Sequence, residues 1–438
     1  MDHPTPIAAT PSRDAATIFN RECQCIGVDV ARLESALGEG LADPSLAAAL
    51  RETHRNLFAP QPVFLARRHF ETMRRLVAAV HETVATPGYQ DAIAARTPHA
   101  LVDTGVRGAL LGFDFHLGLD GPQLIEINTN AGGVLLVAQL ARAQRACCPE
   151  VEPLMRDGAS LEATETALVE MFRSEWRGFA GRRDETGKLG RPLGSVALVD
   201  TSPTEQHLYP EFVLYRRLFE RHGIAASIVA PEELAVVGDR LTAGSSPIDL
   251  VYNRMTDFYF DHPASATVAR AWRERLAAVT PDPRAYALYA DKRNLPLLTD
   301  PKLLHDWGVG ATAIATLGAT VPPARQVRAA DADELWAMRR ELFFKPATGH
   351  GSRGTYDGSG ITRKTFAAVL ESPYVAQKRV APSQRVLAID GKELALKVDL
   401  RCVVYDGDVL LVMARLYRGQ TTNMRTEGGG LASVFGVA

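Results

Sequence analysis

Residues 124–133 read LIEINTNAGG, where an apolar start gives way to a carboxylate, two amides and a pair of glycines. They complete the longer stretch ALLGFDFHLGLDGPQLIEINT, which begins at residue 109. This stretch predicts two strands joined by a turn at Asp120-Gly121.

The polar residues of this hairpin are expected to lie together. Side chains on a strand alternate between its faces, so Leu124, Glu126 and Asn128 should share one face. A turn at residue 120 also places Asp114 opposite Glu126, within one register step. Two carboxylates this close repel unless a proton or a cation lies between them, and Mg²⁺ with oxygen ligands meets that need. A polar cluster at a strand end, with Asn128 in turn hydrogen bonds, is an equally good interpretation of the hairpin alone.

A second motif is the glycine loop GHGSRG at residues 349–354, which follows the strand ELFFKPA. It matches G-x-G-x-x-G, but a dinucleotide fingerprint must open a helix. Here the loop runs into TYDGSGITR, which has turn residues and no helix start. Lys345 at the end of the strand and freely accessible backbone amides in the loop suit phosphate binding. A surface hairpin with a solvated lysine is the alternative.

Two further candidates lie near the end of the chain. In KVDLRCVV, Asp399 and Arg401 share a face of an apolar strand, where burial is costly without a partner or a task. The segment RLYRGQTTNMRTEGGG, residues 415–430, holds Arg415, Arg418, Asn423 and three glycines. It is a candidate anion-binding surface.

The composition is that of a globular protein of more than one domain. The chain has 438 residues, 46% of them hydrophobic and 23% charged, and a net charge of −2. It therefore lacks a basic field for nucleic acid or an anionic membrane, and it has no apolar run long enough to span a bilayer. An odd count of five cysteines, two of them adjacent, argues against a secreted disulfide framework. The start of the chain lacks a signal-peptide pattern, so a reduced cytoplasmic setting is expected.

The spacing Cys23-Gln-Cys25 is not that of a zinc site, so structural thiols are favoured over metal ligands there.

The pattern along the chain changes several times and indicates an α/β protein. Residues 1–104 are predicted to be helical, with a long amphipathic helix at 63–86. Residues 105–190 hold the hairpin and further helices, and a Gly-rich linker ends there. Residues 191–283 alternate strand, helix and strand, which predicts a parallel open sheet. Residues 284–390 carry the glycine loop, and residues 391–438 carry the last strands.

The order of these motifs resembles the ATP-grasp superfamily. FFKPATGHGSRG, then YVAQKRV, then VDLR, then an Arg/Asn/GGG segment follow the order seen in those enzymes. The acidic strand with E-x-N would come next there, whereas here it lies early as IEINT. That arrangement resembles a circularly permuted ATP-grasp, as in eukaryotic-type glutathione synthetases and glutathionylspermidine synthetases. DKRNLPLL before the lid loop points the same way. The resemblance does not cover residues 1–100.

The resemblance implies a role for each candidate residue. Lys292 and Lys345 are expected to contact phosphate. The metal ligands would be Asp114, Glu126 and Asn128, and Asp399 would lie with Arg401 near the phosphates. Arg415 or Arg418, with Asn423, would handle the acyl substrate. The remaining nucleotide-binding residues would be those of the loop and of the adenine strand: Gly349, Gly351, Ser352, Gly354, Gln377, Lys378 and Val380.

Two positions depart from the family pattern. The family often has Arg two residues before the hairpin Asp, and here that residue is Gly112, so Arg401 or Arg107 would have to replace it. The adenine strand often carries Glu where this chain has Gln377.

The implied activity is an ATP-dependent carboxylate–amine ligase with an acyl-phosphate intermediate, using ATP and two Mg²⁺ ions, with Mn²⁺ as an allowed substitute. The partners expected are a small carboxylate and an amine, such as an amino acid or short peptide, and a homodimer is left open. A phosphotransferase on the same fold, or a non-catalytic nucleotide-binding protein, is the alternative. The intact set of lysines and acidic residues argues against the second alternative.

Overall fold

The computed structural model describes residues 14–24, 26–43, 45–46, 50, 54–118, 120–146, 160–183, 190–349, 351, 353–389, 391–423 and 426–437. The predicted loop residue Ser352 lies outside these ranges, as do Cys25, Cys147 and Cys148. Cys23 and Cys402 are buried and free.

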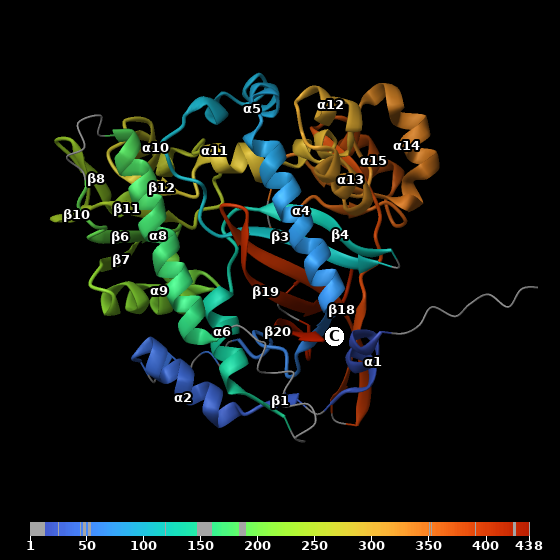
Figure 1. The fold of residues 1–438 in the computed structure, drawn as a ribbon, viewed down its shortest axis with the longest axis horizontal. Coiled ribbons are helices and arrows are strands. Elements are labelled where there is room, and N and C mark those ends of the chain that lie inside the picture. Colours follow the sequence, from blue (N-terminus) through green and yellow to red (C-terminus); the bar gives the residue numbers. More distant parts are fainter. Residues whose placement is uncertain are drawn as a thin grey trace, which may run out of the picture.

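The centre of the protein is a seven-stranded sheet that joins the two ends of the chain (Figure 1). Its order is β2-β20-β19-β18-β3-β4, with β17 also paired to β18. The early hairpin therefore lies directly beside the late strands, because β3 pairs antiparallel with β18. The strands are β2 (Val63–Ala66), β3 (Leu111–Gly118), β4 (Gly121–Asn128), β17 (Gln384–Ile389), β18 (Lys392–Tyr405), β19 (Asp408–Tyr417) and β20 (Gly430–Val437).

Both faces of this sheet are covered, which explains why the late strands read as nearly continuous apolar runs. On one face, Cys402 and Val404 pack in a core with helices α4 and α13. On the other, Val403 and Met413 pack in a core with α6, α8 and α9. The helices are α4 (Arg67–Ala85), α5 (Pro87–Ala94), α6 (Val134–Ala143), α8 (Leu161–Arg183), α9 (Tyr209–Arg221) and α13 (Ala311–Thr320).

A second unit holds a parallel sheet, at the left of Figure 1. Its strand order is β12-β11-β6-β7, and every pairing in it is parallel. The short antiparallel sheet β10-β9-β8 adjoins it. The elements are β6 (Ser195–Val199), β7 (Ala225–Val229), β8 (Leu234–Val237), β9 (Arg240–Ala243), β10 (Ser246–Ile248), β11 (Leu250–Asn253), α10 (Ala266–Arg273) and β12 (Ala278–Thr280).

The glycine loop belongs to a third unit, the sheet β13-β16-β14-β15, called here the lid sheet. Its own small core packs against α14 and α15. The chain reaches it through a broken helical segment that includes α11 (Pro283–Ala285), a π-helix at Tyr286–Ala290 and α12 (Pro301–Asp306). The lid elements are β13 (Ala324–Gln326), α14 (Ala332–Met338), β14 (Leu342–Pro346), β15 (Tyr356–Asp357), α15 (Arg363–Leu370) and β16 (Tyr374–Lys378).

The start of the described chain forms α1 (Ala15–Glu22), β1 (Ile26–Val28) and α2 (Val30–Leu41), and β1 pairs with β5 (Gln144–Ala146). The buried guanidinium of Arg385 on β17 holds α1 in place by donating to the carbonyl oxygens of Asn20 and Cys23.

The α/β class, the parallel sheet and the predicted hairpin at residues 109–129 are confirmed. The prediction of one helix over 63–86 is wrong at its start, because residues 63–66 form β2, parallel to β20. These four apolar residues are all buried between layers, a pattern that does not distinguish a buried strand from a helix end.

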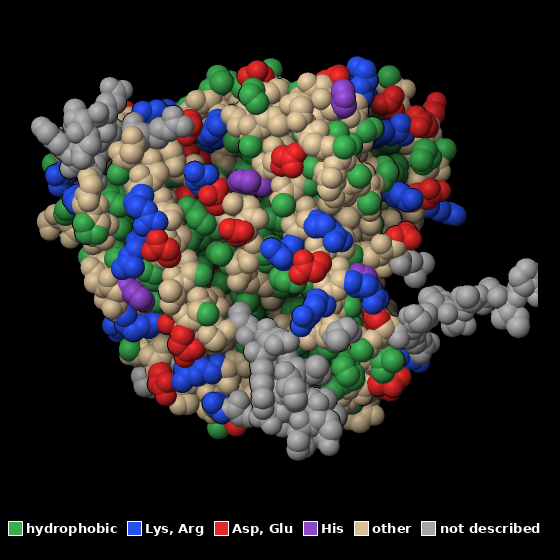
Figure 2. Space-filling view, in the orientation of Figure 1, with side chains coloured by type: hydrophobic (Ala, Val, Ile, Leu, Met, Phe, Trp, Pro, Cys, Tyr) green, Lys and Arg blue, Asp and Glu red, His purple; other side chains and the backbone are tan. Residues whose placement is uncertain are grey.

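Figure 2 shows basic and acidic side chains intermixed over one face of the protein. None of the helices in the described ranges is long and apolar enough to cross a membrane.

Candidate functional site

The hairpin register is the one predicted, with one addition. Asp114 pairs with Glu126 and Gly112 with Asn128, but Phe115 pairs with Leu124. Ile125 is therefore an extra residue, a β-bulge. It turns Leu124 into the core beside Ile127, so the prediction that Leu124 shares the face of Glu126 is wrong. Bulges of this kind often re-aim side chains next to active sites.

Asp114 is buried and held by two arginines of the late strands. Arg401 donates Nε to Oδ1 at 2.6 Å and an Nη to Oδ2 at 2.7 Å, and Arg415 donates to Oδ2 at 2.7 Å. Asn128 donates to the same Oδ2 at 3.0 Å. Burial alone would raise the pKa of Asp114, but the two guanidinium groups hold it below its ordinary value. Asp114 is thus a charged anchor for both arginines.

Arg415 continues this network to Asp399, the residue opposite it on β18. It donates to Asp399 Oδ2 at 2.6 Å, and Thr422 donates to the same oxygen at 2.8 Å. Asp399 Oδ1 is buried with no hydrogen-bond partner in the described chain. Burial raises the pKa of Asp399, as expected for a carboxylate with one oxygen left unpaired.

Glu126 lies on β4 of the hairpin and faces Lys292, which belongs to the segment that precedes the lid sheet. Its Oε2 is 3.7 Å from Lys292 Nζ, and Asn128 donates to its Oε1 at 3.3 Å. Burial opposes ionisation, but Lys292 and Lys345 keep the pKa of Glu126 below its ordinary value. Lys292 also donates to the carbonyl oxygen of Gly349, which links it to the start of the glycine loop.

Lys345 crosses from the lid sheet to the hairpin bulge. Its Nζ donates to the carbonyl oxygen of Ile125 at 2.6 Å and to Gln377 Oε1 at 2.8 Å. Gln377 in turn donates to the carbonyl oxygen of Leu124 at 3.2 Å. Burial lowers the pKa of Lys345 to about 8. The bulge carbonyl is what gives this buried ammonium a strong acceptor.

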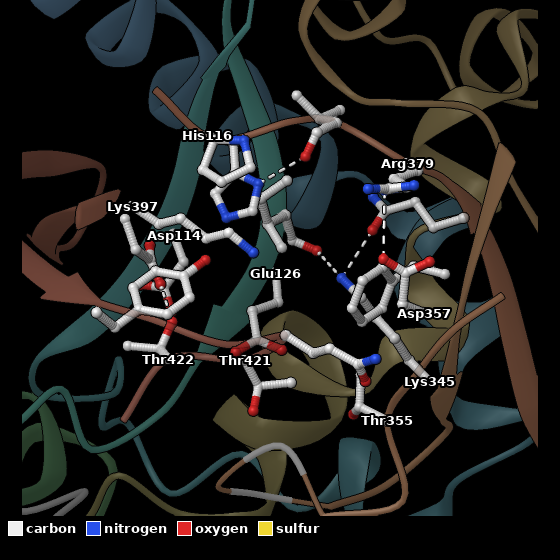
Figure 3. A pocket seen from close by; sticks show the side chains of 18 of the residues that line it. Asp114, His116, Glu126, Lys345, Thr355, Asp357, Arg379, Lys397, Thr421 and Thr422 are labelled. Atoms are coloured by element: carbon white, nitrogen blue, oxygen red, sulfur yellow. Dashed lines mark hydrogen bonds and ion pairs between the residues drawn. The ribbon is translucent and has the colours of Figure 1, made fainter. Parts of the chain in front are cut away.

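These groups surround one cavity between the hairpin, the late strands and the lid sheet (Figure 3). Its empty volume, including the part open to solvent, is about 790 Å³, within the range of small-molecule sites. One end is charged, with Asp114, Glu126, Lys345 and Asp399. The rest of the lining mixes apolar side chains, among them Ile125, Phe343, Val380 and Pro382, with polar and charged ones such as Asp357, Lys378, Arg379 and Lys397.

The other predicted residues lie around this centre in different ways. Lys378 is exposed at the end of β16, and Arg418 is exposed after β19. Asn423 donates to the carbonyl oxygen of Arg418 and accepts from Thr426, so its amide closes the loop after β19. The glycine loop joins two antiparallel strands, β14 and β15, as expected for a hairpin that is not a dinucleotide fingerprint. Gly349, Gly351 and Gly354 all have positive φ.

The three glycines at 428–430 have a packing reason. A Cβ at Gly429 would lie 2.4 Å from the carbonyl oxygen of Leu416, and one at Gly430 would lie 2.4 Å from that of Asn56. Both positions therefore need glycine for close backbone contact, which makes an anion-binding surface an unnecessary explanation for them.

Gly112 has a similar reason, and it bears on the missing arginine. A Cβ there would lie 3.0 Å from Arg401 Nε and 3.2 Å from the Cβ of Ala131. Arg401 thus fills the space beside Gly112. Arg107 instead pairs with Asp406 at 2.7 Å and lines a separate cavity with His81 and Tyr289.

Several residues that line the cavity were not predicted from the sequence, among them His116, Lys397 and Thr422. His116 and Lys397 lie two residues from Asp114 and Asp399 respectively, so strand alternation could have found them. Lys397 donates to the carbonyl oxygen of Gly419 at 2.5 Å. Thr422 lies on a loop, where no periodic signal exists.

The donor set is compatible with Mg²⁺. The described residues contain no cluster of three acidic, His or Cys side chains around one point, so phosphate and water oxygens would have to complete the coordination. Asp399 Oδ1 has no hydrogen-bond partner in the described chain, and the Glu126 carboxylate is bound only at longer range, by Asn128 at 3.3 Å and Lys292 at 3.7 Å. Asn128 could add its amide oxygen, because the two ends of an amide are assigned from the hydrogen bonds around them. The oxygens of Asp114 are already engaged by arginines.

A second polar cluster follows the hairpin, at the carboxyl ends of the parallel strands. Asp200 follows β6 and Arg254 follows β11. Arg254 donates to Tyr252 Oη at 3.0 Å, while its buried Nε has no partner in the described chain. Asn130, at φ 61°, donates to the carbonyl oxygen of Met255, and its buried Oδ1 is also without one. Burial raises the pKa of Asp200 to about 6.

Arg254 lies against the loop that carries Asn128 toward α6. A Cβ at Gly132 would lie 2.9 Å from an Nη of Arg254. Ligands of open parallel sheets bind at the carboxyl ends of the strands, so this cluster lies where such a ligand would be expected.

Comparison with known proteins gives a fold. No protein-family model matches the chain, and no curated protein matches it in sequence. Among solved structures, it is similar to a glutathione synthetase-like effector, GSS30, from Globodera pallida, with 12% identity and a TM-score of 0.57. That match covers 93% of this chain and 98% of the effector.

Two other solved structures match less well. A candidate gamma-glutamylcysteine synthetase from Methylobacillus flagellatus has 11% identity and a TM-score of 0.43, with 84% of this chain and 87% of that chain covered. The ATP-grasp ligase PsnB, solved with a minimal precursor, Mg and ADP, has 15% identity and a TM-score of 0.27, with 55% of this chain and 88% of that chain covered. These two likenesses are too partial to support an argument. The match to the effector extends over nearly the whole of both chains, and the chain therefore has an α/β fold like that of this glutathione synthetase-like protein.

Proposed function

We propose that this protein is an ATP-dependent carboxylate–amine ligase. The observation that carries the proposal is that Lys345, Glu126 and Asp399 line one cavity from three distant parts of the chain, with Lys292 3.7 Å from Glu126. Ammonium and carboxylate groups beside apolar side chains are what a nucleoside triphosphate with its divalent ion needs. The early position of the E-x-N hairpin supports a circularly permuted ATP-grasp.

The proposed reaction forms and then cleaves an acyl phosphate. A substrate carboxylate oxygen attacks the γ-phosphorus of ATP, and the bond to ADP breaks. An amine then attacks the acyl carbon and loses a proton, and the carbon–oxygen bond to phosphate breaks. The products are an amide, ADP and inorganic phosphate. Catalysis of such steps is mostly positioning and charge stabilisation.

Each charged residue has a task in this proposal. Lys292 and Lys345 bind the phosphates, and Arg401 and Arg415, held by Asp114, lie where charge develops during phosphoryl transfer. Glu126, Asn128 and Asp399 would hold Mg²⁺, which supplies charge neutralisation at the phosphate oxygens when bound. Gln377, Lys378 and Val380 border the base, and the glycine loop around Gly349, Gly351 and Gly354 borders the phosphates. The setting proposed is the cytoplasm.

The substrates bind beside the nucleotide in this proposal. Arg254 has an unpaired buried Nε and lies against Gly132, next to the metal-binding hairpin. A guanidinium so placed would anchor a carboxylate group of the substrate, and Asp200 would attract an ammonium group. The cluster thus fits an amino acid or short peptide. Arg418 and Asn423 border the acyl group from the other side.

Measurement of ADP release tests the proposal. The full-length protein is incubated with Mg²⁺, ATP and a panel of amino acids and short peptides, each acid and amine alone and in pairs. A ligase forms ADP only when both an acid and an amine are present, whereas a phosphotransferase needs one acceptor. Adding hydroxylamine to an active acid should yield the hydroxamate, which traps the acyl phosphate.

The variants Glu126→Ala and Lys345→Ala should lose turnover while keeping the fold. Lys302→Ala is the matched control, because Lys302 is 86% exposed on α12, and it should keep full turnover. Full activity in Glu126→Ala or Lys345→Ala would show that the site is misassigned.

A further inference from the structure

The ring orientation of His116 leaves one ring nitrogen without a hydrogen-bond partner among the described residues. The residue follows Asp114 on β3 by two positions, so it faces the same cavity. Its Nδ1 lies 2.9 Å from the carbonyl oxygen of Val380. A carbonyl oxygen can only accept, so Nδ1 carries the hydrogen. In the neutral imidazole, Nε2 is then a bare acceptor.

The second nitrogen points away from Val380 toward the interior of the cavity, on the side of Lys397 and Glu126 (Figure 3). No hydrogen bond engages Nε2 within the part of the chain that the structure describes. His116 therefore lies in the cavity between Val380 and the end that holds Lys345.

The chemistry of Nε2 decides which part of a nucleotide can occupy the space before it. Phosphate oxygens are acceptors, so a bare nitrogen lone pair would repel them. The nucleoside, in contrast, carries donors: the 2′ and 3′ hydroxyls of ribose and the 6-amino group of adenine. The proposed function assigns the phosphates to Lys292 and Lys345, which leaves the nucleoside for the region of His116.

We propose that His116 is a specificity residue for the nucleotide, its Nε2 accepting a hydrogen bond from a donor of the nucleoside, either a ribose hydroxyl or the adenine amino group. The inference rests on the proposed function, since it requires that a nucleotide binds this cavity. The hydrogen bond from Nδ1 to Val380 fixes the tautomer and ring orientation. His116 in this way selects among nucleotides by the presence of one donor.

The test is calorimetric binding of Mg²⁺–ADP and three analogues to the full-length protein. The analogues are 2′-deoxy-ADP, 3′-deoxy-ADP and IDP, in which the amino group is replaced by a carbonyl oxygen. One of the three should bind about tenfold more weakly than ADP, because it leaves the buried acceptor unpaired. The analogue affected identifies the donor.

Two variants separate the acceptor from the orientation of the side chain. His116→Asn can keep a donor to Val380 through its amide but cannot reach the position of Nε2, so it should bind ADP about tenfold more weakly and no longer discriminate against the affected analogue. His116→Gln places an amide near the position of Nε2 and should recover part of the discrimination. Thermal unfolding of both variants reports whether the fold is retained.

The outcomes distinguish the two proposals. If the wild-type protein binds ADP and all three analogues equally, the assignment of His116 is overturned while the nucleotide site stands. If His116→Asn still discriminates as the wild type does, the assignment is overturned as well. If the wild-type protein binds no ADP, the proposed function fails and the role of His116 fails with it.

Discussion

At the scale of single residues, Lys345 is an ammonium group whose pKa is set by its buried surroundings. Its ammonium is buried and bound by a backbone carbonyl and by the neutral Gln377. The pKa of about 8 means that the charge is present below pH 8 and is lost above it. Affinity for Mg²⁺–ADP should therefore fall as the pH rises through about 8.

Gln377→Glu should shift this fall to higher pH. A carboxylate beside Lys345 stabilises the ammonium and raises its pKa. The measurement is the dissociation constant of ADP between about pH 6.5 and 9.5, a range that brackets the titration. Lys302→Ala, at the 86% exposed side chain on α12, is the control and should follow the wild type. Superimposable curves for Gln377→Glu and the wild type would contradict the assignment of the titrating group.

A second prediction concerns Gly112→Ala. The added methyl would lie 3.0 Å from Arg401 Nε and 3.2 Å from Ala131, so Arg401 must move from its two hydrogen bonds to Asp114. We expect a loss of about 1–3 kcal/mol in the free energy of unfolding, as for other overpacked sites. Turnover should fall with it.

The control for Gly112→Ala is Gly436→Ala on β20, where the added methyl meets nothing within 4 Å. Urea unfolding of both variants gives the comparison. Equal stability of the two variants would mean that Arg401 does not depend on the space beside Gly112.

At the scale of elements, helix α6 begins immediately after the loop that follows Asn128. Its first amides are capped from another helix: Glu211 on α9 accepts from Gly133 N at 2.8 Å and from Leu135 N at 3.2 Å. Since α6 starts where the hairpin ends, this carboxylate also fixes the loop that holds Asn130. The cap therefore links helix stability to the geometry of the site.

Glu211→Ala should destabilise the protein by about 1–3 kcal/mol for each buried amide left unpaired. Glu211→Gln keeps an acceptor oxygen and should lose less. Glu220→Ala, on the same helix but in an exposed ion pair with Arg217, should lose about 0–1 kcal/mol. Chemical denaturation measures all three, and a loss in Glu211→Ala no larger than in Glu220→Ala would exclude the cap as a stabilising contact.

The elements also show what the sequence could and could not predict. The hairpin register followed from a turn at Asp120-Gly121 and from strand alternation. The bulge at Ile125 could not be predicted, because an apolar residue in a strand has the same sequence pattern whether it pairs with the neighbouring strand or is an extra residue. The small sheet β8 to β10 was missed, since its strands are only three or four residues long.

The ion pairs between Asp114 and the two arginines could not be predicted from the sequence either. Asp114 looks like a metal ligand when read with Glu126 and Asn128, and nothing local reveals that arginines from β18 and β19 occupy its oxygens. Through the order of motifs the sequence predicts Arg401 near the phosphates and Arg415 or Arg418 at the acyl substrate. The contact of Arg401 and Arg415 with Asp114 depends on strand pairing between residues 287 and 301 positions apart.

At the scale of the whole molecule, the early hairpin depends on the last strands of the chain. β3 has β18 as its neighbour on one side and β4 on the other, and β18 leads on to β19 and β20 in the same sheet. A chain that ends at residue 390 should lack a cooperative unfolding transition, because the sheet that supports both cores is then incomplete. Circular dichroism during a urea titration checks this against the full chain. A sharp transition in the shortened chain would show that the early part folds by itself.

The long separation in sequence between Asp114 and Arg401 has a consequence during synthesis of the protein. A ribosome adds roughly 5–20 residues each second, so the 287 residues between them take about 15–60 s to appear. Throughout that interval the hairpin already carries Asp114, which is buried in the folded protein. The guanidinium groups of Arg401 and Arg415, which bind it there, have not yet been synthesised. The aspartate must stay in water until the closing strands leave the exit tunnel, and the inner sheet of this protein can form only after β18 and β19 have been made.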